Sequence, residues 1–547
     1  AAVTIYLPTR RAARALGAIL AERLGRLAHE RGAPGYAALL PRMIPLGEAD
    51  EAELDLASEP QLEDNDPLST PMPPLERRLI LARLVQAWAQ TVDRPLLPLD
   101  AEVPCLVPSS PADAVGLAGD LERLMDALTV EGLPWSEIGA AVEAEYSRYF
   151  GLTLDFVKIA AENWPKLLAE RGLSDPVARA RGLVLAEGQR LARTAPTDPV
   201  IVAGSLGSVP ATARLIAAVA KLPRGAVVLP GLDLDLDEAG WSGIDTGEGF
   251  SRVIAHGHPQ AVLHRLLGPD NLALSRAEIV ALGDPDGGQA ARSMLLSQAL
   301  RPADTTDAWA DLDPGQRDAI AERGLDGLAL AEAADEREEA LVAALALRET
   351  LEVPGATAAL VTPDRGLAGR VAVELLRWGI VAEDSAGLAL AGSPAGRLAR
   401  LTAELAADLA RNQADAIPAR LIALPSHPMV RLGLTRSDVV RGAAALEIGL
   451  LRGPVPAPGF SGLRNALAAE RVGPPERRPR AKRRLKDIDW DLAEDLLKRL
   501  DQVFAAFPGP DGAGECDLVA VAALHRAACD WLIAGPEDAP EAIEDGS

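Results

Sequence analysis

The sequence has 547 residues, 48% of them hydrophobic and 24% charged, so several packed domains are expected rather than a disordered chain. Its net charge of −24 excludes a protein that binds nucleic acid through overall charge, because such a surface repels phosphate over most of its area. No apolar run reaches the length of a membrane span, and no secretory signal opens the sequence. We therefore expect a cytoplasmic protein that makes no contact with a membrane.

The first predicted unit is an α/β domain. Val3–Leu7 has the continuous apolar character of a buried strand, and Thr9 is a suitable N-cap for a helix that extends to about Glu30. Two further apolar strands, Pro199–Ala203 and Ala226–Leu229, flank a helix, as a parallel crossover connection requires. We therefore expect these three strands in one mostly parallel sheet.

Helical periodicity predicts helices throughout Leu75–Arg193, and a Gly-, Pro- and Asp-rich stretch after the first domain indicates a linker. Strand signals return at Gly327–Leu330, Ala358–Thr362 and Gly379–Ala382, with helices between them. The predicted fold class is α/β, with two parallel-sheet domains that carry large all-helical insertions. The predicted boundaries are 1–50 with 195–282 for the first α/β domain, 51–194 for its helical insertion, 283–324 for the linker, 325–415 for the second α/β domain, and 416–547 for a further helical insertion.

The ends of the sequence suggest a fragment. The first strand begins almost at Ala1, and an acidic tail closes the chain without a final element, so we expect the last helical insertion to be incomplete. Charge is also unevenly distributed. Nine acids and no basic residue lie in Glu48–Asp66, and a second acidic stretch covers Glu537–Asp545. Such runs are usually solvated faces or loops.

The densest positive patch is the run Glu476–Lys486 (ERRPRAKRRLK). Clustered Arg and Lys release counterions from a phosphate backbone, so this run is a candidate for nucleic-acid contact. A solvated loop, or a partner for the acidic segments of the same chain, is the alternative. No aromatic residue is interleaved, which lowers the chance of base stacking. The candidate residues are Arg477, Arg478, Arg480, Lys482, Arg483 and Arg484.

Seven segments, in order along the chain, together resemble the AddB subunits of α-proteobacteria. They are Val3–Leu16 (VTIYLPTRRAARAL), Leu40–Asp50 (LPRMIPLGEAD), Ala203–Ala213 (AGSLGSVPATA), Pro223–Glu238 (PRGAVVLPGLDLDLDE), His258–Leu267 (HPQAVLHRLL), Ala358–Arg365 (AALVTPDR) and Asp384–Leu398 (DSAGLALAGSPAGRL). The resemblance implies that both α/β domains are helicase-like, of the RecA-like, superfamily-1 type. It also implies a nuclease domain at the far end of the full protein and a partner, AddA, that supplies the motor.

The resemblance places Pro8–Arg11 at the helicase motif that follows the first nucleotide-binding strand, where a loop meets single-stranded DNA. The chemistry of the segment suits this role, because a helix start offers N–H groups to a phosphate and two guanidiniums flank it. Thr9, Arg10 and Arg11 are therefore candidate DNA-binding residues. The alternative is an ordinary capped helix whose arginines face solvent.

Nucleotide chemistry is expected to be weakened or lost. A phosphate-binding loop ends in Gly-Lys-Ser/Thr, and the dipeptide Gly-Lys occurs nowhere in the sequence. The segment around Ala358 resembles the fourth helicase motif, in which an Arg at the strand end helps to bind the γ-phosphate of ATP. Here the strand end carries Thr362, and Arg365 and Arg370 lie nearby but off register. We therefore interpret these three residues as a degenerate nucleotide motif and expect no cofactor.

No catalytic or metal site is predicted. The acidic run Leu232–Glu238 resembles a metal-binding motif, but a calcium loop that starts at Asp233 would need Gly and Glu where Glu238 and Ile244 stand. A solvated turn is the simpler interpretation. The histidines, such as His258 and His264, and the cysteines, Cys105, Cys516 and Cys529, match no metal-ligand spacing.

The leading hypothesis is a non-motor, helicase-like subunit of a double-strand-break repair complex, which binds single-stranded DNA and docks an AddA-type subunit as a heterodimer. The nuclease ligands of the family are missing from the sequence, so this chain is expected to be non-catalytic. Two alternatives stay open. One is an active nucleotide-dependent helicase or nuclease whose ATP-binding loop precedes Ala1, and the other is a scaffold that binds only proteins.

Overall fold

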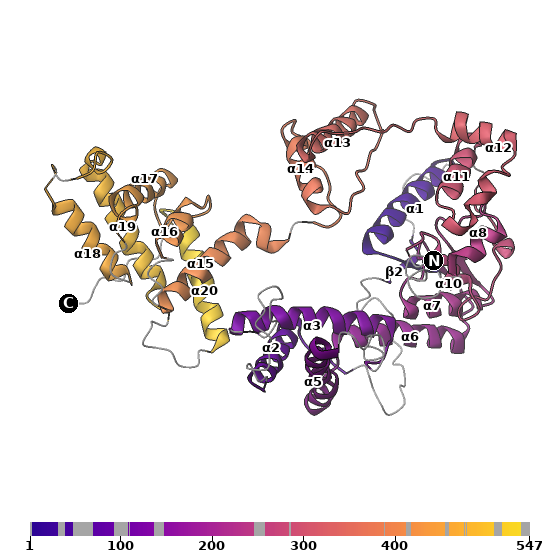
Figure 1. Ribbon diagram of the computed structural model, residues 1–547, viewed down its shortest axis with the longest axis horizontal. Coiled ribbons are helices and arrows are strands. Elements are labelled where there is room, and N and C mark those ends of the chain that lie inside the picture. The colour runs from indigo at the N-terminus through magenta and orange to yellow at the C-terminus, as the bar shows by residue number, and fades with distance from the viewer. Residues whose placement is uncertain are drawn as a thin grey trace. The chain divides into compact units, whose positions relative to one another are not determined.

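The protein is mostly helical and contains one small parallel β-sheet (Figure 1). It divides into two compact units, Ala1–Leu330 and Ala331–Ser547, and each is described on its own. A computed structural model describes residues 3–30, 39–46, 69–91, 108, 110–135, 147–245, 257–283, 286–387, 389–411, 417–454, 459–474, 476, 478–507 and 517–537. Arg477, Cys105, Cys516, the acidic run Glu48–Asp66 and most of the stretch Glu537–Asp545 lie outside these residues.

The helices of the first unit surround the sheet or form the long insertion between its strands. The α-helices are α1 (Arg10–Glu30), α2 (Pro74–Thr91), α3 (Pro111–Glu131), α5 (Ser147–Arg171), α6 (Pro176–Thr194), α7 (Pro210–Ala220), α8 (Glu238–Ser242), α10 (Ala261–Leu267), α11 (Gly287–Ala299) and α12 (Pro314–Ala319). The short 3₁₀ and π segments are η3 (Gly243–Asp245), η4 (Arg276–Glu278), η5 (Ala303–Trp309) and η6 (Ile320–Gly324).

Four parallel strands form the sheet, in the order β2-β1-β3-β4. The strands are β1 (Thr4–Leu7), β2 (Arg42–Pro45), β3 (Val200–Ala203) and β4 (Gly225–Val228). The prediction that three separated apolar runs share one parallel sheet is confirmed, with β1 and β3 paired in the register Thr4↔Val200. The strand β2 was not predicted. Its Pro45 is tolerated because β2 is an edge strand, where one side of the backbone needs no partner.

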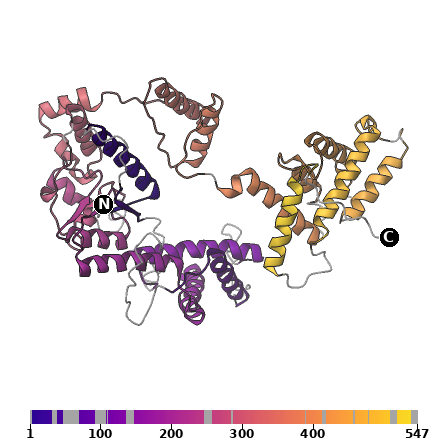
Figure 2. The ribbon, with the colours of Figure 1, turned by 180° about the vertical axis from the view of Figure 1, so that it is seen from behind.

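The helical insertion has a core of its own beneath α3. Here α2 packs against α3, and α5 packs against α2 (Figures 1 and 2). The buried Arg77 of α2 ties the group together, since its guanidinium pairs with Asp126 at 2.7 Å and with Asp175 at 2.9 Å. Asp175 also N-caps α6, accepting from Val177 N at 3.0 Å, and accepts from Trp164 Nε1 at 3.2 Å. One carboxylate therefore fixes the start of α6, which leads back to the sheet.

The stretch expected as a linker, 283–324, contains α11, α12 and two shorter helical turns. Its Arg301 is buried and pairs with Asp237 at 2.6 Å, and Asp237 is the N-cap of α8. This stretch therefore packs onto the region that follows β4. Gly, Pro and Asp mark helix ends as well as loops, and here they separate several short helices.

The prediction of a second α/β domain is corrected, because only one α/β region is present in the described structure. The segments Gly327–Leu330, Ala358–Thr362 and Gly379–Ala382 contain no strand, and Leu330 and Val361 are 90% and 93% exposed. The helices between them, α13 (Glu336–Leu351) and α14 (Arg365–Leu376), pack against each other instead. An apolar run becomes a buried strand only where other elements cover its faces, and no such cover lies on these described segments.

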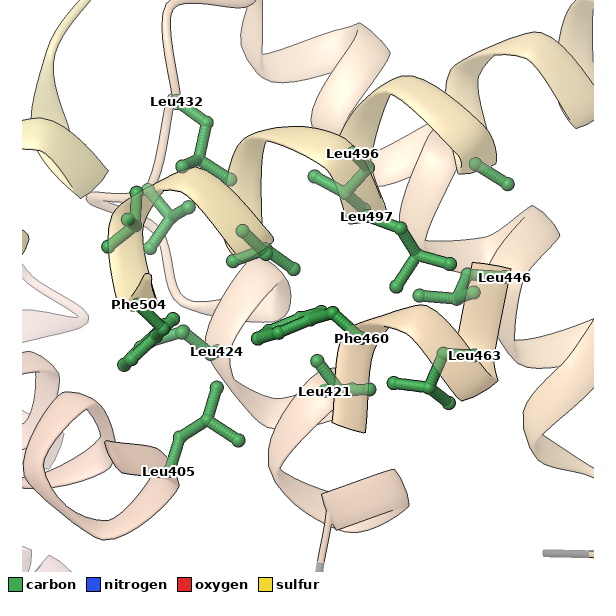
Figure 3. Close-up of a cluster of buried hydrophobic side chains, with 14 of the residues drawn as sticks. Leu405, Leu421, Leu424, Leu432, Leu446, Phe460, Leu463, Leu496, Leu497 and Phe504 are labelled. Atoms are coloured by element: carbon green, nitrogen blue, oxygen red, sulfur yellow. The ribbon is translucent and has the colours of Figure 1, made fainter. Parts of the chain in front are cut away.

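The rest of the second unit is a helical bundle. Figure 3 shows its core, in which Phe460 lies among Leu421, Leu424, Leu463 and Leu497. Phe460 and Phe504 stack with ring centroids 6.2 Å apart. The helices are α15 (Pro394–Ala410), α16 (Ile417–Ser426), α17 (Arg436–Leu446), α18 (Gly459–Val472), α19 (Asp487–Phe504) and α20 (Leu518–Ile533), with the short turns η7 (Leu390–Gly392), η8 (Glu447–Leu451) and η10 (Lys482–Arg484).

A buried polar contact joins the sheet to the insertion. The Tyr6 hydroxyl on β1 donates to Glu187 on α6, and the Arg190 guanidinium donates to both oxygens of that carboxylate at 2.7 and 2.8 Å. Burial raises the pKa of the Tyr6 hydroxyl, which stays protonated. Burial alone would raise the pKa of Glu187, but the hydrogen bonds from Arg190 and Tyr6 outweigh it and hold that pKa below its ordinary value of 4.5. Glu187 is therefore a buried, paired carboxylate.

We predict that Glu187→Gln lowers the free energy of unfolding at neutral pH by about 2 kcal/mol, because the substitution leaves Arg190 without its charged partner. A carboxylate whose pKa is depressed on folding stabilises the protein above its unfolded pKa and loses that effect as pH falls through the folded pKa. The difference in free energy of unfolding between the original protein and Glu187→Gln should therefore shrink below about pH 4. Urea unfolding over a pH series measures it. The exposed Glu170→Gln is the control, and a pH-independent difference would contradict the prediction.

Candidate nucleic-acid interface

The start of α1 is built by the four residues that follow β1. Pro8 has no N–H to continue the strand, and the Thr9 hydroxyl accepts from Ala12 N at 3.1 Å, which caps the helix. Arg10 and Arg11 are the first helical residues, and both side chains are exposed. The sequence prediction of a helix from about Thr9 to Glu30 is confirmed. The arrangement places a helix start and two guanidiniums at one end of the sheet.

A second loop meets this helix start at the same edge. Gly204 follows β3, and its N–H donates to Val228 O at 3.0 Å. Its φ of +77° lies in the left-handed region, and a Cβ built there would lie 3.6 Å from Pro8 Cδ. The loop therefore lies against Pro8, the residue that follows β1. Because parallel strands end at a common edge, ligands of α/β sheets bind there. The sequence analysis quoted this loop only for its family resemblance and assigned it no site role.

The acidic segment Leu232–Glu238 follows β4 at the same edge of the sheet and forms a turn. The Asp233 carboxylate accepts from the backbone N–H groups of Asp235 and Leu236, both at 2.9 Å. Within the residues that the structure describes, no group of three or more His, Cys, Asp or Glu side chains could hold a metal ion. His258, a residue considered for metal binding, accepts from Gln260 N at 3.1 Å and lies 2.6 Å from Leu300 O.

The basic run of the second unit does not present all its charges to solvent. Arg478 turns inward, and its guanidinium donates to Arg471 O and, at 2.9 Å, to Gly473 O, two carbonyls at the end of α18. The same guanidinium lies over the ring of Trp490, 5.5 Å from its centroid. Cations stabilise carbonyls at a helix C-terminus, so Arg478 acts as a helix cap.

Lys482 is also used inside the unit, since it pairs with Glu470 at 2.8 Å and only 13% of its side chain is exposed. Arg483 Nε donates to Arg478 O at 2.9 Å, and its side chain is otherwise exposed, as are those of Arg480 and Arg484. Arg478 and Lys482 also line a surface hollow of about 600 Å³. Of the six candidates in this run, three described side chains therefore face solvent, two stabilise the unit, and Arg477 lies outside the described residues.

The residues of the degenerate nucleotide motif begin α14. The Thr362 hydroxyl accepts from Asp364 N at 3.0 Å, and Asp364 is the N-cap of the helix. Arg365 forms a two-pronged ion pair with Asp384, and Arg370 pairs with Glu336 at 3.1 Å. Both arginines thus hold neighbouring segments of the second unit. Each contact has an intramolecular role, and none requires a nucleotide.

The three candidate sets belong to different parts of the chain. Thr9, Arg10 and Arg11 lie in the first unit, whereas the basic run and the Thr362 set lie in the second. The structure brings together Pro8–Arg11 and the Gly204 loop. In the described chain no helix is both long and apolar enough to cross a membrane. In comparisons with known proteins, no protein-family model and no curated protein matches this chain.

We predict that Arg478→Ala lowers the free energy of unfolding of the second unit by about 2 kcal/mol, because it removes two hydrogen bonds from a charged donor and a cation–π contact. Arg480 lies two residues away and is exposed. Arg480→Ala removes the same charge and should change the free energy of unfolding by less than about 0.5 kcal/mol. Chemical denaturation followed by circular dichroism measures both. Equal effects of the two variants would contradict the assignment of Arg478 as a helix cap.

Proposed function

We propose that this chain is a non-motor, helicase-like subunit of a bacterial double-strand-break repair complex, and that it holds single-stranded DNA and docks a motor subunit of the AddA type. The observation that carries the proposal is the edge of the parallel sheet at which β1 ends, α1 starts, and the Gly204 loop lies against Pro8. In this proposal the sheet is of the RecA-like, superfamily-1 type.

The chemistry of this edge suits a phosphate backbone. The first N–H groups of α1 and the positive end of its dipole favour an anion, and Arg10 and Arg11 can donate in the forked geometry that phosphate accepts. The neighbouring loop, Gly204–Val209, carries two glycines and two serines, so a nucleic-acid strand can approach its backbone closely. These contacts are local, which reconciles them with a net charge of −24.

Support for a non-motor role comes from the residues that a motor would need. The sequence lacks a Gly-Lys dipeptide, so no phosphate-binding loop of the usual kind lies within it. Arg365 and Arg370, the nearest candidates for a γ-phosphate contact, are engaged by Asp384 and Glu336. An active nucleotide-dependent enzyme stays as the alternative, and a phosphate-binding loop outside this sequence would favour it.

A docking role for the second unit is supported by exposed apolar side chains. Val361 is almost fully exposed, and Val381 and Leu390 also face solvent. Large apolar side chains exposed in this way are found at protein interfaces. A purely protein-binding scaffold, the second alternative, shares this surface with the proposal. The two differ in whether DNA binds at the start of α1.

We predict that the double substitution Arg10→Ala with Arg11→Ala weakens binding to single-stranded oligonucleotides about tenfold at low salt, without changing sequence preference. Each lost phosphate contact should reduce the slope of log affinity against log salt by about 0.7. Fluorescence anisotropy over a salt series measures both quantities. The matched control is Arg23→Ala with Arg26→Ala, which removes the same charge from the other end of α1.

Equal loss in the two double variants would mean that total charge, rather than this helix start, governs binding. Unchanged affinity in the Arg10 and Arg11 variant would favour the protein-binding scaffold. ATP hydrolysis that is stimulated by DNA in the purified chain would favour the active enzyme. The last two outcomes therefore point to different alternatives.

A further inference from the structure

The strand β4 leaves one side of its backbone open. Val200 N–H donates to O of Arg224, just before β4, at 3.1 Å, and Gly204 N–H donates to Val228 O at 3.0 Å, so the even-numbered residues along this stretch face β3. Backbone groups alternate in direction along a strand, so Val227 directs its N–H and C=O away from β3. Among the described strands, β4 pairs only with β3 and is an edge of the sheet.

An apolar hollow of about 510 Å³ lies along this edge. Val227 of β4 and Leu229, which follows the strand, line it, and the segment Ile279–Leu282 contributes a second set of aliphatic side chains. That segment is apolar and includes the β-branched Ile279 and Val280, yet Val280 and Leu282 are 81% and 77% exposed. A hollow with aliphatic walls and one row of open backbone groups suits an extended polypeptide better than a polar small molecule.

Charges at the two ends of β4 give the hollow a direction. Lys221 and Arg224 precede the strand, and both are exposed. Asp233 and Asp235 follow it, and Leu232 and Leu234 beside them line the hollow. Burial, together with the neighbouring carboxylate of Asp233, raises the pKa of Asp235, so a cation placed there would be favoured.

We propose that the open edge of β4 accepts a β-strand from a partner protein, running parallel to β4 between it and Ile279–Leu282. The partner strand has an apolar, β-branched centre, with acidic residues before it, next to Lys221 and Arg224. Basic residues follow it, next to Asp233 and Asp235. A second copy of this protein fits less well. Ile279–Leu282 borders a space suited to a single strand, whereas a second copy would present its edge strand together with the rest of its sheet. This inference does not depend on the DNA-binding proposal.

The test uses a labelled peptide, Glu-Glu-Val-Thr-Val-Ile-Val-Lys-Lys, and the peptide with its acidic and basic ends exchanged. The first should bind the full chain at least about tenfold more tightly, as measured by fluorescence anisotropy. Binding should also slow hydrogen exchange at the Val227 amide, because that N–H becomes a ladder donor.

Val227→Pro should reduce peptide affinity at least about tenfold, because it removes the open N–H and leaves the bonds to β3 in place. Val227→Ala is the matched control that keeps the N–H and should retain binding. If Val227→Pro fails to fold, Val280→Lys with Leu282→Lys decides, since both side chains are exposed and line the hollow; this variant should also lose binding.

Three outcomes would overturn the proposal. Equal affinity for the two peptides would remove the charge argument. Unchanged binding in the variants would place the peptide elsewhere. Slow exchange of the Val227 amide in the protein alone, or dimerisation that the variants abolish, would show that the edge is covered without a partner strand.

Discussion

The pairing of β1 with β3 is the constraint on which the first unit depends. The two strands lie about 200 residues apart in sequence, and their parallel register is held from Thr4↔Val200 onward. The sheet cannot form until the insertion between them has folded back, and the buried contact from Tyr6 to Glu187 and Arg190 fixes α6 at that return. Asp175 fixes the other end of α6. The short sheet thus depends on a long helical insertion whose last helix, α6, is held by two buried carboxylates.

The same topology explains why function is proposed at one edge. Parallel strands deliver every following loop to one side, so the start of α1 and the Gly204 loop meet although they are far apart in sequence. In an acidic protein, the position of an arginine matters more than the number of arginines. Arg10 and Arg11 begin one helix, Arg478 caps the end of another, and Arg365 pairs with Asp384. Arginine side chains with the same charge therefore have different roles.

Much of the first unit could be predicted from the sequence, because continuous apolar runs next to helix-capping residues are local signals. Thr9 and the run Val3–Leu7 are examples. The absence of a second sheet could not be predicted in this way. Val361 is an apolar, β-branched residue of the kind found in buried strands, yet it is exposed to solvent. Strand formation depends on neighbours that a short run does not encode. The inward turn of Arg478 was equally hidden, because it depends on carbonyls at the end of α18 and on Trp490.

Photo-crosslinking of single-stranded DNA to the whole chain tests the central claim most directly. A strand that carries photoreactive thymidine analogues would be irradiated in the complex, and the crosslinked peptides would be identified by mass spectrometry. The account predicts crosslinks within residues 8–14 and within Gly204–Val209, the two segments that meet at the edge of the sheet. Crosslinks confined to other parts of the chain, with neither segment labelled, would contradict it.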